Sequence, residues 1–397
     1  MKNIILFIVL AVLFNFIEAH PNNLEKLTLS QNEFGFKIFA ELTKTEKLKN
    51  IIISPTSIIL ALAMAYNGAQ GETKEAIAKV LGISELEDKT FNETNLLLQN
   101  TLSTQNKKLI LKIANSLWID KSCKFKKPFI EINKKFYRAK LSSLNFASPN
   151  AIEMINRWVK DATNGKIEKI ATEIPEDVWA ILINALYFKG AWQEAFNKTQ
   201  TKEMPFYRLD GTEKSHLFMY KKSKFLYFEN DEIQTISIPY ANGTYTMDIF
   251  LPKKEFPIEK LVYTLSYDRY LEWQRAMETR DGEVYLPRFK LDYETSLKEV
   301  LSNMDMKIAF EPGLADFTKM ATTPIKGRMF IGDVKHKTYI EVSEEGTEAA
   351  AVTGVFMEIK SAPSKPFTMI LDRPFLYIIR NSKTQTVVFI GILTEPK

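Results

Sequence analysis

Cysteine is almost absent from this chain: among 397 residues only Cys123 is a cysteine. A single thiol cannot form an intramolecular disulfide, so packing must stabilise the fold. Cys123 lies in "DKSCKFKK", where basic neighbours could lower the pKa of its thiol. The alternative interpretation is an incidental surface or half-buried thiol.

Histidine is also scarce, and the usual catalytic motifs are missing. The three histidines are His20, His216 and His336, and no H-E-x-x-H, G-x-S-x-G, Walker loop, G-x-G-x-x-G or Cys/His zinc cluster occurs. Neither His216 nor His336 lies in a recognisable nucleophile context. Carboxylate pairs leave no compact signature and stay open. The sequence predicts a protein that is not an enzyme and that needs no metal or cofactor.

Long apolar runs occur only at the N-terminus. "MKNIILFIVLAVLFNFIEAH" has Lys2, an apolar run from Ile4 to Leu13 and a small-residue cleavage site after Ala19. This pattern predicts a signal peptide at 1–19, and therefore a secreted, extracellular protein. The alternative is a membrane anchor, for which the run is too short. Secretion would make three Asn-x-Ser/Thr sequons candidates for N-glycosylation: Asn92, Asn197 and Asn242.

Linkers, repeats and low-complexity tracts are missing too, so we expect one domain at 20–397. Helical patterns dominate the first half, as in "AIEMINRWVKDATNGKI", which should end at Asn164-Gly165. Strand patterns dominate the second half, and Asn242-Gly243 predicts a tight turn between two of them. The order of patterns predicts an α+β fold with sheets built from distant segments.

Positive charge is only in mild excess, with a formal net charge of +5. It is concentrated in residues 121–140, which hold eight Lys/Arg and one Glu. Lys134, Lys135 and Arg138 could share one face of a helix. A solvated helix face is one interpretation and a site for sulfated glycans is the other; a nucleic-acid partner is not expected.

Eight segments resemble the serpin family, in that family's order and approximate spacing, from about residue 30 to the end. They are "ISPTSIILALAMAYNGAQGET", "ANSLWID", "INRWVKDATNGKI", "LINALYFKGAW", "SIPY", "LPRFKLDYETSLKEVL", "HKTYIEVSEEGTEAAAVTGV" and "LDRPFLYIIRNSKTQTVVFIGIL". Two stretches depart from the family's usual wording, "IGDVKHK" and "PFTMILDRPF". The general look is arthropod-like.

The resemblance implies a monomeric serpin fold with three β-sheets, about nine helices and an exposed reactive-centre loop at about 344–366. In inhibitory serpins a target serine protease cleaves this loop. The loop then inserts as a new middle strand of the largest sheet and the bound acyl-enzyme is distorted. We expect this inhibitory function; the alternative is a non-inhibitory serpin, a carrier or storage protein.

The composition of the loop fits insertion. Alternate side chains of a strand point to opposite faces, and one phase of this segment is uncharged and mostly small. No proline interrupts 346–362 and Gly346 can act as a hinge. The predicted hinge and inserting residues are Glu344, Gly346, Thr347, Ala349, Ala350, Ala351, Thr353 and Val355.

In the family, the protease attacks the bond after the fourteenth loop residue, with the hinge threonine counted as the first. Counting from Thr347 gives the bond Lys360–Ser361. A lysine at this position suits a trypsin-like protease, whose specificity pocket holds a carboxylate.

The resemblance also assigns two polar groups. Ser54, Ser57, Asn184 and His336 match the cluster beneath the middle of the large sheet, the shutter, so His336 is expected to be structural. Trp192, Arg288 and Glu344 match the opening at the top of that sheet, the breach, where a Glu344–Arg288 ion pair is expected.

Overall fold

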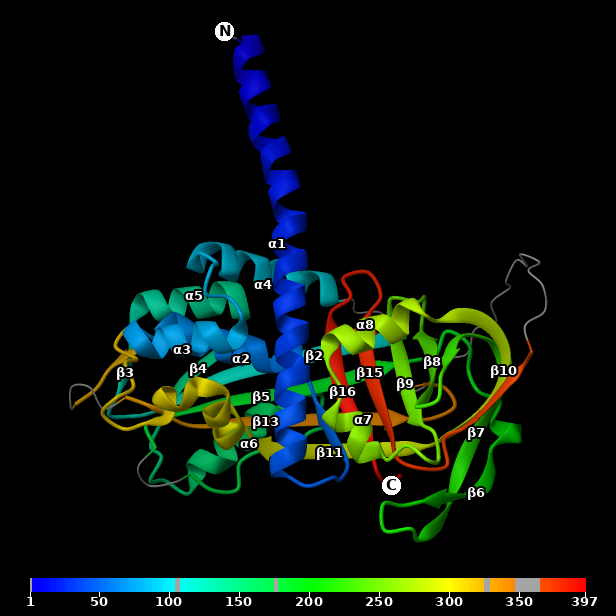
Figure 1. Ribbon diagram of the computed structural model, residues 1–397. Helices are drawn as coiled ribbons and strands as arrows, with labels where there is room; N and C mark the ends of the chain where they lie inside the picture. Colours follow the sequence, from blue (N-terminus) through cyan, green and yellow to red (C-terminus); the bar gives the residue numbers. More distant parts are fainter. Residues whose placement is uncertain (1, 104–107, 175–177, 325–328, 347–364) are drawn as a thin grey trace.

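The computed structural model describes residues 2–103, 108–174, 178–324, 329–346 and 365–397, with side chains from residue 23. Helix α1 (Lys2–Thr45) begins outside the main body and runs into it (Figure 1). The predicted signal peptide lies within this helix, and its removal stays a prediction. No helix whose side chains are described is long and apolar enough to cross a membrane.

The first half of the chain is mainly helical, as its patterns predict. Helix α2 (Pro55–Gly68) begins with Pro55 at its first turn, and Ser54 caps it by accepting a hydrogen bond from the Ser57 amide. Helix α6 (Asn150–Ala162) ends where Asn164 and Gly165 adopt positive φ, 55° and 77°. The other helices are α3 (Gly71–Leu81), α4 (Asp88–Leu102), α5 (Lys127–Tyr137), α7 (Ile258–Tyr263), α8 (Tyr267–Arg275) and α9 (Lys298–Leu301).

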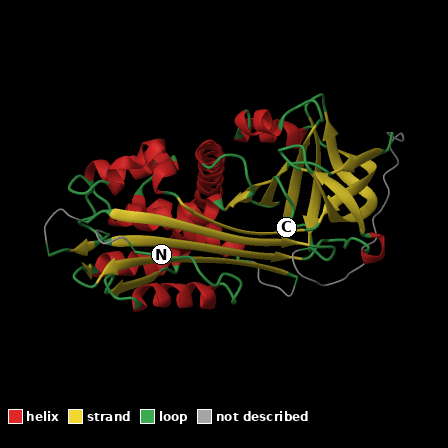
Figure 2. Ribbon diagram, turned by 90° about the horizontal axis from the view of Figure 1, so that it is seen from below, coloured by secondary structure: helices red, strands yellow, loops and turns green. Residues whose placement is uncertain are grey.

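A five-stranded sheet runs through the middle of the molecule, with helices on both faces (Figure 2). Its order is β11 (Phe289–Ser296), β13 (Ile331–Val342), β5 (Ala180–Gly190), β2 (Leu109–Asp120) and β4 (Lys140–Leu144). Strands β13 and β5 are parallel neighbours, in register at His336 and Asn184. Ile183 and Tyr187 pack with Ile155 and Val159 of α6, whereas the alternate residues of β5 join the main core.

A nine-stranded sheet occupies one end of the molecule (Figure 2). Its order is β1 (Ile51–Ile53), β16 (Val387–Leu393), β15 (Phe375–Asn381), β9 (Tyr245–Pro252), β8 (Ile233–Tyr240), β7 (Glu213–Glu229), β10 (Glu278–Pro287) and β14 (Phe367–Ile370), with β6 (Lys202–Tyr207) paired to β7. Strands β12 (Ala321–Thr322) and β3 (Lys124–Phe125) form a third sheet. Within the described ranges the fold is α+β with three sheets and nine α-helices, which confirms the prediction.

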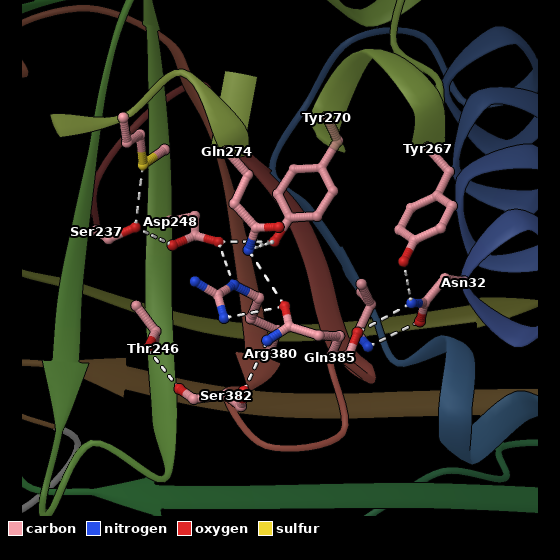
Figure 3. A network of polar contacts seen from close by, with 12 residues as sticks. Asn32, Ser237, Thr246, Asp248, Tyr267, Tyr270, Gln274, Arg380, Ser382 and Gln385 are labelled. Atoms are coloured by element: carbon pink, nitrogen blue, oxygen red, sulfur yellow. Dashed lines mark hydrogen bonds and ion pairs between the residues drawn. The ribbon is translucent and has the colours of Figure 1, made fainter. Parts of the chain in front are cut away.

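A buried ion pair ties α8 to the nine-stranded sheet (Figure 3). Asp248 Oδ2 accepts a hydrogen bond from Arg380 Nε at 2.7 Å and another from the Tyr270 hydroxyl at 2.7 Å. The Ser237 hydroxyl donates to the other carboxylate oxygen. Burial, and next the nearby Asp248 charge, raise the pKa of Tyr270 well above its usual value. Loss of either ion would leave the other buried and unpaired.

Candidate functional site

The candidate site lies where β13 leaves the five-stranded sheet. After Val342 the chain turns back: the Ser343 amide donates to Gly346 O at 2.9 Å and the Gly346 amide donates to Ser343 O at 3.0 Å. Because β13 and β5 are parallel, a chain that reverses direction after β13 runs antiparallel to both strands. The turn at residues 343–346 therefore lies where the ends of β13 and β5 meet.

The turn already touches the end of β5. Gly346 forms an antiparallel bridge with Ala191, and the Trp192 amide donates to Glu345 O at 3.0 Å. The φ of Gly346 is +106°, and a Cβ there would lie 2.3 Å from Gly190 O. Only glycine fits this conformation and this approach, so Gly346 is a structural requirement of the turn.

The structure brings Glu344 and Arg288 together at this end of the sheet. Arg288 Nε donates to Glu344 Oε1 at 2.8 Å, and Arg288 Nη2 and the Thr201 hydroxyl donate to the same oxygen. Burial alone would raise the pKa of Glu344, but the hydrogen bonds from Arg288 and Thr201 outweigh it and lower this pKa. Glu344, which is 2% exposed, is therefore held as a buried carboxylate.

Trp192 lies just after β5 and contacts the turn at residues 343–346. Its ring stacks on Tyr240, with centroids 4.3 Å apart, and its indole nitrogen donates to Ser343 O at 2.9 Å. The tryptophan thus connects the nine-stranded sheet to the turn that follows β13. Both its ring and the ion pair hold the turn in place.

A second polar group lies beneath the middle of the sheet, between β13, β5 and α2. His336 Nε2 accepts from the Ser54 amide at 3.1 Å, so the ring proton is on Nδ1, which donates to Asn184 Oδ1 at 2.5 Å. Asn184 Nδ2 in turn donates to Ser57 O at 2.9 Å and to the Ser57 hydroxyl. Complete burial lowers the pKa of His336 to about 3, so the ring is neutral at physiological pH.

Two members of this cluster were not among the predicted residues. Asn115 of β2 accepts from Asn184 Nδ2 at 2.5 Å, and the Thr338 hydroxyl of β13 donates to Ile52 O at 2.8 Å. Asn115 lies in "LILKIANSLWI", which also contains Lys112 and Ser116, so no local pattern singles it out.

The predicted reactive bond and the inserting segment lie outside the described residues. These are Thr347, Ala349, Ala350, Ala351, Thr353, Val355, Lys360 and Ser361. The structure does place the two flanks. The chain leaves β13 of the five-stranded sheet and returns at β14, which pairs in parallel with β10 of the nine-stranded sheet. The loop therefore connects two different sheets.

The three sequons differ in exposure. Asn92 is 3% exposed, and its amide nitrogen donates to Asn67 Oδ1 at 3.0 Å while its oxygen accepts from Tyr137. Asn197 is exposed at the start of a short 3₁₀ turn, and Asn242 is exposed in the turn between β8 and β9. The last position agrees with the tight turn that Asn242-Gly243 predicts.

Cys123 lies in a setting that decides between the two interpretations of its thiol, against the reactive one. The side chain is buried, at 4% exposure, and burial raises the pKa of the thiol, whereas the lysine-rich sequence had suggested a lowered pKa. A buried, protonated thiol is unreactive. Among the described residues, no group of three His, Cys, Asp or Glu side chains is placed to hold a metal ion.

Comparisons with known proteins identify the class. Residues 29–396 match the family model described as serpin (serine protease inhibitor). Serpin B6 of Pongo abelii is 35% identical over 386 residues, covering 94% of this chain and 100% of the relative. Iripin-2 of Ixodes ricinus is 32% identical over 376 residues, covering 92% of each.

A solved structure agrees. The thermophilic serpin tengpin in its native state superposes with a TM-score of 0.85 at 31% identity, covering 93% of this chain and 94% of that one. The chain belongs to the serpin family, and like the family it is not an enzyme.

Proposed function

We propose that this protein is an inhibitory serpin that traps a trypsin-like serine protease at Lys360–Ser361. One observation supports this most directly: β5 and β13 are parallel neighbours, and the turn after β13 already bridges to the end of β5. A cleaved loop that continues from this turn would enter between these two strands of the five-stranded sheet; the resemblance had placed the insertion in the largest sheet, but the nine-stranded sheet has more strands. The alternate loop residues that carry no charge would all face one side of the sheet, so insertion would bury no charge on that side.

Insertion requires β5 and β13 to move about 4.8 Å further apart, the spacing of one strand. The bond from His336 Nδ1 to Asn184 Oδ1 spans these two strands, so it must break for the new strand to pass. A dozen inserted residues, each adding about 1 kcal/mol net per hydrogen bond, would release on the order of 10 kcal/mol. This is a net gain, because the inserted strand would form one ladder with β5 and another with β13 in place of the single parallel ladder between them.

Lys360 supports the trypsin-like class of target. Its ammonium group would pair with a carboxylate in the specificity pocket of the protease, and Ser361 is small enough for the leaving side. The similarity to the tick protein Iripin-2 is compatible with an arthropod-like serpin.

Incubation with trypsin and denaturing electrophoresis test the proposal. We expect a covalent complex that survives SDS and is lost in Lys360→Glu, which removes the cation from the bait. If wild type gives only cleaved protein, it is a substrate rather than an inhibitor, and the carrier or storage alternative replaces the proposal.

We further propose secretion, with removal of residues 1–19 and N-glycosylation at Asn197 and Asn242. The basic–apolar–small order of the N-terminus supports the first, and exposure of the two asparagines supports the second. Asn92 is not included in this proposal, because its side chain is buried. Protein recovered from culture medium should begin at His20, and its mass should fall on removal of N-glycans. Asn197→Gln combined with Asn242→Gln should abolish that mass change.

A sulfated glycan is a further proposed partner, for the basic segment 121–140. Lys134, Lys135 and Arg138 are exposed at the end of α5, although Arg138 Nη2 is engaged with Asn100. Heparin should accelerate inhibition of trypsin in a salt-dependent manner if this surface binds it. A rate that heparin leaves unchanged would favour an ordinary solvated helix face.

A further inference from the structure

Two tyrosines lie next to each other across the junction between β5 and β13. Tyr187 of β5 and Tyr339 of β13 are partners in the parallel ladder, and their ring centroids are 6.2 Å apart. Both side chains are buried and pack in the cluster that contains the apolar residues of α6. They therefore lie on the face of the five-stranded sheet that α6 covers.

Lys166 reaches both rings from the segment that follows α6. Its Nζ lies 6.0 Å from the ring centroid of Tyr187 and 5.8 Å from that of Tyr339. Both distances are within the range of a cation–π interaction, which extends to about 6 Å. One ammonium group therefore contacts a ring on each of two neighbouring strands.

The backbone around Lys166 is fixed to the end of α6. The Gly165 amide donates to Lys160 O at 2.7 Å, and the Ile167 amide donates to the Thr163 hydroxyl at 3.1 Å. The side chain of Ile167 is fully buried in the same cluster as the two tyrosines. The position of the lysine is thus set by its own segment and does not depend on either strand.

Insertion of the loop would break this arrangement. It moves β5 and β13 about 4.8 Å further apart, so an ammonium group that is already about 6 Å from both rings can stay with only one of them. The contact with the other ring then exists in the closed sheet and not in the opened one. An interaction that is absent from the transition state slows the transition.

A second lysine contacts the same tyrosine without crossing the junction. Lys290 of β11 has its Nζ 5.4 Å from the ring centroid of Tyr339, and it is the partner of Glu341 in the ladder between β11 and β13. Insertion between β5 and β13 leaves that ladder intact. Lys290 therefore keeps its contact with Tyr339, whereas Lys166 loses one of its two contacts.

We propose that Lys166 is a positioning residue that limits the rate of loop insertion, because it holds Tyr187 and Tyr339 together until the new strand enters. This inference rests on the proposed insertion between β5 and β13 and adds a control of its rate. The bond between His336 and Asn184 connects the same two strands from the opposite face, since residues 336 and 339 of β13 point to opposite sides of the sheet.

The probe for the test is a synthetic peptide with the sequence of residues 347–358, "TEAAAVTGVFME", which would take the place of the inserted loop. Its uptake by the intact full-length protein is followed over time by native electrophoresis. Lys166→Met keeps the length of the side chain and removes the charge. It should speed uptake by about twofold to thirtyfold, the range for loss of one cation–π contact.

Two further variants separate the cation–π contact from packing and from net charge. Lys166→Arg keeps the cation and should take up the peptide at close to the wild-type rate. Lys290→Met removes a cation from the same ring and should leave the rate unchanged. Equal acceleration in Lys166→Met and Lys290→Met, or in Lys166→Met and Lys166→Arg, would overturn the proposal.

Wild-type protein separates failure of this inference from failure of the proposed function. Wild type that takes up no peptide and forms no covalent complex with trypsin would overturn both. If wild type does both, and Lys166→Met takes up the peptide at the wild-type rate, only the role of Lys166 is overturned. Circular dichroism checks that each variant is folded, and Lys166→Gln is a second neutral variant that should behave as Lys166→Met does.

Discussion

His336 makes the stability of the folded sheet depend on pH. The unfolded chain takes up a proton at this residue near pH 6.5, whereas the folded protein does so only near pH 3. Unfolding therefore binds a proton in this window, and stability that is present above pH 6.5 is lost as the pH falls. Between pH 7 and pH 5 this residue should lower the free energy of unfolding by about 1–2 kcal/mol.

Urea unfolding at the two pH values measures this loss. His336→Gln provides the control, because its amide can accept from Ser54 and donate to Asn184 but does not titrate. We expect most of the pH dependence between pH 7 and pH 5 to disappear in this variant. An unchanged slope would assign the titration to another group, such as His216, whose pKa burial also lowers.

Glu344 is the residue whose loss should free the turn after β13. Glu344→Gln removes the negative charge that pairs with Arg288 and leaves a neutral amide facing the guanidinium group. Breaking a fully buried ion pair in this way lowers the free energy of unfolding by about 3–5 kcal/mol. The loss of stability should be smaller here, because the Arg288 side chain is 39% exposed and water screens its charge. The turn should detach more easily, and mild heating should give polymers or spontaneously inserted protein on native gels.

The neighbouring Glu345 provides a matched control. It pairs with Lys198, which is 62% exposed, and an exposed pair of this kind contributes little to stability. Glu345→Gln should therefore remain monomeric after the same heating. Polymerisation of both variants to the same extent would show that loss of any charge near the turn suffices.

At the residue scale, the sequence predicted the polar groups only where a family pattern covered them. The structure brings Ser54, Ser57, Asn184 and His336 together, and their role stays a prediction, whereas Asn115 and Thr338 were missed. The Asp248–Arg380 pair was missed as well, because its members are separated by 132 positions and no local pattern links them. Partners of this kind meet only through the pairing of β9 with β15.

The alternation of the loop gives a prediction at the scale of one strand. Thr347 belongs to the phase that would be buried on insertion and Glu348 to the opposite phase. Thr347→Arg should convert the inhibitor to a substrate, because the first inward position would carry a charge that costs several kcal/mol to bury. The ratio of covalent complex to cleaved protein with trypsin measures this change.

Glu348→Arg tests the phase itself. It also places an arginine in the loop, one residue further on, but on the face that remains in water. We expect it to keep forming complex. Inhibition that is unaffected in both variants, or lost in both, would show that the two phases are not distinguished and that the alternation argument fails.

Element boundaries were predictable where a local signal marks them. Ser54-Pro55 begins α2 and Asn164-Gly165 closes α6, since capping and positive φ are properties of a few adjacent residues. The order of the strands was not predicted. Strand β13 lies between β11 and β5, and such long-range pairing is not encoded in the periodicity of any single segment.

At the scale of the whole molecule, cleavage of the loop should stabilise the fold. A loop cut at Lys360 and inserted between β5 and β13 adds a full strand and its hydrogen bonds to the central sheet. The thermal midpoint of the cleaved protein, followed by circular dichroism, should lie well above that of intact protein, by ten degrees or more for about 10 kcal/mol. An equal or lower midpoint would mean that the loop stays outside the sheet.

The parallel contact between β5 and β13 has a consequence for how the chain reaches its structure. If a better-paired arrangement of the same residues exists, the observed fold is metastable, and folding must stop before the sheet closes around its own loop. Denaturation would then not be a reversible path. Protein refolded from denaturant should contain two forms, an active one and a loop-inserted one that no longer inhibits. The inhibitory activity of a sample would then depend on how it was folded as well as on its sequence.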